Sequence, residues 1–148
     1  MVKVSLQDWL NEGRLKAHKT SRKEIEQLFA VFERDMRDTR AEDLSADRRF
    51  ATAYNAALMA ARAALAASGY RTSGEGSHYW TIQSLAFTLQ LDTNTITKFN
   101  KFRQKRNISD YEMIGMVSEQ EVSEMVALAK TLRETVAAWL KNNHPELV

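Results

Sequence analysis

Residues 45–71, SADRRFATAYNAALMAARAALAASGYR, decide the fold of this chain. Alanine fills much of this stretch, and alanine is favourable in a helix and lets neighbouring helices approach closely. Ser45 suits an N-cap, and Gly69 suits the left-handed residue that follows a helix. The larger apolar side chains recur at steps of three and four residues, which places them on one side of a helix; with two alanines they are Phe50, Tyr54, Ala57, Leu58, Ala61 and Leu65. The stretch therefore predicts the central helix of a bundle.

The composition is that of one globular domain. The chain has 148 residues, of which 44% are hydrophobic, so it is long enough to bury a core and is not disordered. Its 21 basic and 19 acidic residues nearly balance, so any basic character that matters must be local. The absence of cysteine excludes disulfides and thiolate metal sites and suits a cytoplasmic protein. No apolar run approaches the roughly 18 residues of a membrane span, so we expect a soluble protein without a membrane partner.

Capping patterns predict where further helices begin. A serine followed three residues later by Asp or Glu precedes an apolar periodicity at Ser5, Ser21 and Ser118. Asp92 can cap another helix, and the pattern of apolar residues predicts a shorter one at 82–89. We therefore expect one all-α domain over residues 1–148, an up-and-down antiparallel bundle of about five to six helices.

Two segments interrupt the helical pattern. Residues 71–77, RTSGEGS, contain two glycines and predict a flexible loop. Residues 107–117 are polar and contain Gly115, so we expect them to separate the last two helices. The sequence shows no strand-like alternation and no internal repeat.

The histidines give no metal-binding pattern. The sequence contains neither HExxH nor two paired Glu-x-x-His motifs nor a phosphate-binding glycine loop, so we expect no metal and no cofactor. His78 follows the glycines of 71–77 and is either a helix-end or surface residue or a proton carrier that reaches a site. His18 and His144 lie near predicted helix ends, where dipole contacts or simple exposure explain them.

Two arginines share a helix face with phenylalanines. Between Lys98 and Arg106 the chain has five basic residues and no acidic one. A solvated basic face is one explanation, and an i,i+4 contact between Arg106 and Asp110 is another. At about 100° per residue, however, Arg103 and Arg106 fall on the apolar side of the helix, and the lysines fall on the other side. Guanidinium groups in that position, near Asn107, Asp110 and Tyr111, could bind phosphate.

The segment 102–112, FRQKRNISDYE, resembles the signature region of HEPN-domain proteins. In that family an arginine is followed four to six residues later by a histidine or, in some subfamilies, by an Asp-Tyr pair, and Arg106-x-x-x-Asp110-Tyr111 matches the second form. The alanine-rich stretch and the long last helix are similar to the family's helices as well. The resemblance covers a core at about 45–140, and the helices at 5–40 lie outside it.

The resemblance implies a dimeric helical bundle, either a metal-independent ribonuclease, often the toxin of a toxin–antitoxin pair with a nucleotidyltransferase, or a nucleotide-binding or adaptor protein. By resemblance the catalytic group would be Arg106, Asp110 and Tyr111, with Arg106 stabilising charge on the phosphate. Nucleotide or RNA would be bound by Arg103, Lys105, Asn107 and His78. The family's catalytic histidine is absent here, and neither Asp nor Tyr with an ordinary pKa is an efficient base near pH 7.

Three hypotheses remain from the sequence. The first is a module that binds a nucleotide, RNA or a nucleotidyltransferase partner and forms a homodimer. The second is an active ribonuclease that uses the same cluster, with help from His78. The third is a bundle that serves only protein association.

Overall fold

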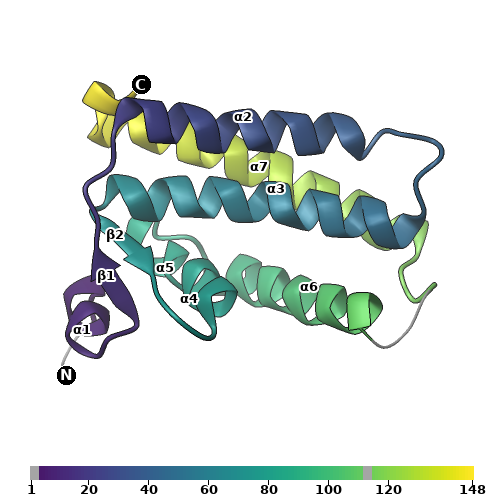
Figure 1. Ribbon diagram of the computed structural model, residues 1–148, viewed down its shortest axis with the longest axis horizontal. Coiled ribbons are helices and arrows are strands. Elements are labelled where there is room, and N and C mark those ends of the chain that lie inside the picture. Colours follow the sequence, from purple (N-terminus) through teal and green to yellow (C-terminus); the bar gives the residue numbers. More distant parts are fainter. Residues whose placement is uncertain (1–3, 112–114) are drawn as a thin grey trace.

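A computed structural model describes residues 4–111 and 115–148, with the side chains of residues 109–111 outside the described part. The chain is mainly helical, which confirms the predicted all-α class (Figure 1). In chain order the elements are α1 (Leu6–Asn11), β1 (Leu15–Ala17), α2 (Arg22–Asp38), α3 (Ala46–Ala67), β2 (Tyr70–Thr72), α4 (Ser77–Gln83), α5 (Leu85–Thr88), α6 (Thr93–Tyr111), α7 (Glu119–Asn143) and the 3-10 turn η1 (Pro145–Leu147).

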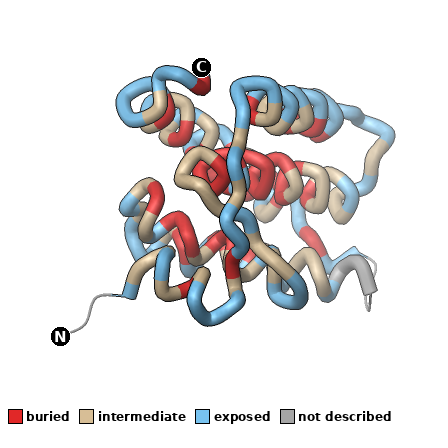
Figure 2. The backbone as a smooth tube through the Cα atoms, turned by 60° about the vertical axis from the view of Figure 1, so that its left-hand side comes forward, coloured by how far each residue is buried: buried red, intermediate tan, exposed pale blue. Residues whose placement is uncertain are grey.

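Helix α3 is the centre of the bundle, as the sequence predicts. It packs against α2 and α7 on one side and against α4 and α6 on the other (Figure 1). Most of its alanines are buried, and the buried part of the backbone is concentrated in this helix (Figure 2). Small side chains allow such contact on several sides, because they let other helices approach its backbone closely.

The predicted helix boundaries agree closely with the structure at several ends. The Ser45 hydroxyl accepts a hydrogen bond from the Arg48 N–H at 3.2 Å, and Gly69 follows α3 with φ of +98°. Ser5 and Ser118 both form complete capping boxes with the acidic residue three positions later. Ser21 caps α2 through the Glu24 N–H, but the Glu24 carboxylate contacts His18 and Thr20 instead.

The structure differs from the prediction in three places. Arg71 and Thr72, predicted as the start of the loop at 71–77, belong instead to β2, which pairs antiparallel with β1 so that Lys16 lies opposite Arg71. The predicted helix at 82–89 is two short helices, α4 and α5, which meet at Ser84. Helix α6 continues through Asn107 to Tyr111, where a polar break was expected. In each case tertiary or backbone contacts determine the secondary structure, because the intrinsic propensity of these short segments is weak.

Acidic side chains join α3 to its neighbours. Asp35 of α2 is 4% exposed and accepts a hydrogen bond from the Asn55 amide of α3 at 2.7 Å. The other carboxylate oxygen of Asp35 accepts two hydrogen bonds from the Arg34 guanidinium. Asp47, in the first turn of α3, accepts hydrogen bonds from the backbone N–H groups of Gly115 and Val117. These contacts fix α2 and the segment before α7 relative to α3.

The N-terminal elements cover one end of α3. Trp9 of α1 and Leu15 of β1 form a small apolar cluster with Leu65, and Trp9 makes edge-on ring contacts with Trp80 and Phe87. The sheet thereby places β2 and the following glycines beside α4. None of the described helices is both long and apolar enough to span a bilayer.

Candidate functional site

Helices α4 and α6 meet at a small surface hollow of about 310 Å³, which we call the smaller hollow. Arg103 and Asn107, one turn apart on α6, form one wall. The other wall begins with the glycines before α4 and continues into its first turn, and its residues are Gly74, Gly76, Ser77, His78 and Tyr79. Gly74 and Gly76 both have positive φ, which a residue with a side chain adopts less readily, so glycine suits this close turn.

Arg103 is held at the smaller hollow by its neighbours. Its Nε donates a hydrogen bond to the Asn100 side-chain oxygen at 2.8 Å, and its Cζ lies 5.5 Å from the centre of the Tyr79 ring. Among the residues that the structure describes, no carboxylate forms an ion pair with Arg103. A half-buried guanidinium with an aromatic neighbour and no carboxylate can bind an anion from solvent.

Arg106 lies deeper, toward α3. Its Cζ is 5.8 Å from the centre of the Tyr54 ring, and its Nη1 donates a long hydrogen bond of 3.5 Å to the Asn107 side chain. Tyr54 is 1% exposed, so Arg106 brings positive charge next to a buried phenol. The predicted placement of both arginines on the apolar side of α6 agrees with these contacts.

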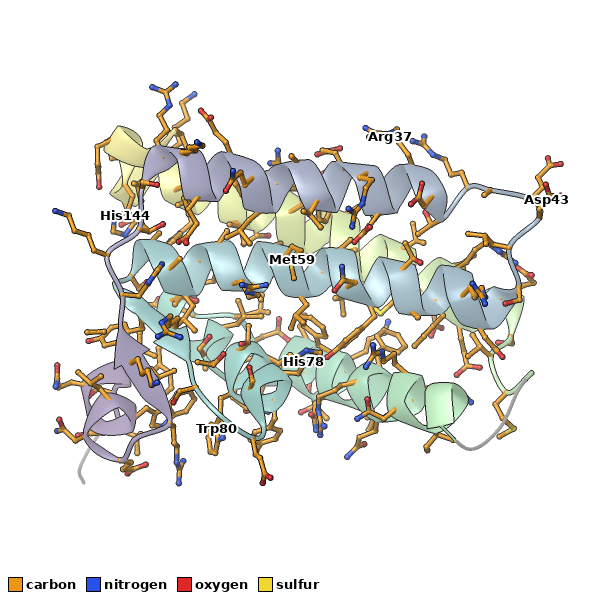
Figure 3. All side chains as sticks on the ribbon, viewed as in Figure 1. Arg37, Asp43, Met59, His78, Trp80 and His144 are labelled. Carbon is orange, nitrogen blue, oxygen red and sulfur yellow. The ribbon has the colours of Figure 1, made fainter. Side chains whose placement is uncertain are left out.

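His78 and Tyr54 share a hydrogen bond between Nδ1 and the phenol oxygen, at 3.2 Å. His78 lies on the side of α3 that faces α4 and α6, and the residue is exposed (Figure 3). Partial burial lowers the pKa of His78 below 6.5, and the positive charges of Arg106, Arg103 and Arg62 lower it further. Burial raises the pKa of Tyr54 to about 12, although Arg106 and Arg103 oppose this rise, so the phenol stays protonated at neutral pH.

A second cavity of about 450 Å³, the larger hollow, lies on the other side of His78. Both hollows are lined by Ser77 and His78. Helices α2 and α3 supply apolar residues to the lining of the larger hollow, including Leu28, Leu58 and Met59, together with the polar Asn55. Basic and acidic side chains from α2, α3 and the β1–β2 end of the molecule also line the larger hollow, namely His18, Glu24, Arg62 and Arg71.

The structure places only part of the predicted site together. Arg103, Asn107 and His78 line one hollow, and Arg106 lies behind them against Tyr54. Lys105 is separate, because its Nζ forms an ion pair with Glu121 of α7 at 3.4 Å. The side chains of Asp110 and Tyr111, predicted as catalytic, lie outside the described residues.

Sequence reasoning missed three contributors to the site. Tyr54 was assigned only to the core, and Tyr79 was assigned no role. Arg62 is the only charged residue between Phe50 and Ala67, and that isolation in an apolar stretch was a signal that could have been used.

The other histidines lie apart from the smaller hollow. His18 Nε2 is 2.7 Å from the Glu24 carboxylate, and His144 contacts the Trp139 ring near the end of α7. Within residues 4–111 and 115–148, leaving out the undescribed side chains, no three His, Asp or Glu side chains form a group that could hold a metal ion. No protein-family model matches this chain, and no curated protein matches it either.

Proposed function

We propose that this protein is a HEPN-like helical module that binds the phosphate of a nucleotide or of RNA at the smaller hollow. The observation that carries the proposal is Arg103, a half-buried guanidinium at the hollow to which no described carboxylate is paired. Guanidinium groups bind phosphate oxygens through two parallel hydrogen bonds, which makes phosphate the best-matched anion.

The neighbours of Arg103 also suit a nucleotide. The Asn107 side chain can hydrogen-bond to phosphate or sugar, and the exposed part of Tyr79 gives a ring on which a base can stack. Gly74 and Gly76 carry no side chain that would keep a ligand away from the backbone. The resemblance of the α6 segment to HEPN-domain proteins supports the same class of ligand.

Binding to a short fluorescent RNA tests the proposal. We expect binding that weakens with salt, and Arg103→Gln should flatten the slope of log K against log salt by about 0.7. Arg37→Gln is the matched control, because Arg37 is exposed on the outer side of α2, far from His78 (Figure 3). No binding at low salt, or equal slopes for both variants, would contradict the proposal and favour a bundle that serves only protein association.

A second candidate, a metal-independent ribonuclease, is favoured by the place of His78. A histidine whose pKa is lowered is neutral at pH 7 and can accept a proton from a ribose 2′-hydroxyl, while arginines stabilise charge on the phosphate. We expect cleavage of labelled RNA, if present, to fall about 100-fold or more in His78→Gln. Cleavage that is equal in His78→Gln and wild type would come from a contaminating nuclease.

The resemblance also leads us to propose a homodimer and a nucleotidyltransferase partner, in the setting of a toxin–antitoxin pair. Those assemblies would bring the α6 segments of two chains to one cleft.

A further inference from the structure

Two arginines, Arg62 and Arg71, line the larger hollow with one carboxylate, that of Glu24, which interacts electrostatically with Arg62. Arg62 donates only to the Met59 sulfur, at 3.6 Å, and Arg71 is exposed on β2. Among the described residues, neither arginine forms an ion pair with a carboxylate. The volume of the larger hollow, about 450 Å³, is within the range of small-molecule sites, about 300–1,000 Å³.

The negative groups near the larger hollow are already engaged. Glu24 lines it, but one oxygen of this carboxylate accepts hydrogen bonds from both His18 and Thr20, each at 2.7 Å. Asp35 lies behind Asn55 and is bonded to it and to Arg34. Glu75 is an exposed loop residue that lines neither hollow. The arginines therefore outnumber the available carboxylates.

The two hollows share Ser77 and His78 in their linings, and arginines lie on both sides of these two residues. Arg103 and Arg106 approach them from α6, and Arg62 approaches them from α3. A single phosphate at Arg103 would not neutralise the positive charge of the larger hollow. A second phosphate in the same ligand could bind there at little additional entropic cost, because it is linked to the first.

We propose that the site takes a ligand with two or more linked phosphate groups, one at Arg103 in the smaller hollow and another at Arg62 and Arg71 in the larger hollow. This inference rests on the proposed function, because it needs phosphate binding at Arg103. The linked phosphates can belong to a polyphosphate chain or to an oligonucleotide backbone.

Calorimetric titration of the full chain at low salt tests this, with inorganic phosphate, tripolyphosphate and the dinucleotide pUpU as probes. We expect tripolyphosphate or pUpU to bind at least about tenfold more tightly than phosphate. Arg62→Gln should remove most of that advantage while phosphate binding stays within about twofold. Arg37→Gln controls for the loss of one positive charge elsewhere. Both arginines are exposed, so these variants should fold.

The outcomes separate the two proposals. If Arg103→Gln weakens phosphate binding and Arg62→Gln has no more effect than Arg37→Gln on either longer probe, the two-phosphate inference is wrong and the proposed function stands. If Arg103→Gln leaves phosphate binding unchanged, the proposed function fails. A loss confined to tripolyphosphate indicates a polyphosphate ligand, and a loss confined to pUpU indicates a nucleic-acid backbone; both support the inference.

Discussion

Replacing Phe99 with alanine is expected to lower the free energy of unfolding by about 3–5 kcal/mol. Phe99 of α6 is fully buried, and its ring makes an edge-on contact with Tyr54 at 5.8 Å between centres. Removing the ring takes away buried apolar surface and leaves a cavity, and α3 and α6 are held by other contacts that limit their collapse. For a domain whose total stability is about 5–15 kcal/mol, the loss is a large fraction.

Urea denaturation followed by circular dichroism measures this loss. Lys101→Ala is the matched control, because Lys101 is on the same helix but exposed, and its replacement should change stability by no more than about 0.5 kcal/mol. A loss below about 1 kcal/mol for Phe99→Ala would mean that α6 does not depend on this side chain to pack on α3.

Replacing Arg106 with glutamine is expected to weaken binding of phosphate-bearing ligands by up to about tenfold, because it removes a positive charge near the site. Arg106 lines neither hollow, so the loss is one of electrostatic attraction and not of a direct hydrogen bond to phosphate. Glutamine keeps a polar side chain near Asn107 but removes the positive charge beside Tyr54 and His78. The same change should raise the pKa of His78, because Arg106 is among the charges that lower it.

NMR titration of the His78 ring separates a site effect from general damage to the fold. In wild type the folded pKa of His78 is below 6.5, so the unfolded chain takes up a proton first and stability decreases as the pH falls through this range. A bound phosphate favours protonated His78, so binding should strengthen over the same fall in pH. In Arg106→Gln the pKa should move back toward 6.5, whereas Lys101→Gln should leave it unchanged. An unchanged His78 pKa in Arg106→Gln would show that the two residues do not interact.

Local patterns were sufficient to predict most of the helices. Serine with an acidic residue three positions later satisfies the first N–H groups of a helix wherever it occurs, so Ser5 and Ser118 could be read directly. The strands β1 and β2 could not be predicted from local sequence, because each has three residues and they are separated by more than fifty positions. Such a short segment has no measurable alternation and is stabilised only by its distant partner.

For the candidate site, the sequence predicted the direction of Arg103 and Arg106 from helical phase alone. It also drew attention to His78, but it could not tell a surface histidine from one beside the arginines. The contact of His78 with Tyr54 joins residues 24 positions apart on different helices. Such a contact depends on how α4 packs against α3, and no local spacing encodes that packing.

The sequence by itself determined the helical class, the central position of α3 and the inward face of α6, because periodicity and capping act within a few residues. Only the tertiary structure decided that α4 brings His78 between two hollows, that Lys105 pairs with Glu121 instead of joining Arg103, and that Arg62 faces the site. The physical reason is that burial, charge proximity and cavity shape are set by the relative placement of helices, and these depend on contacts between distant residues.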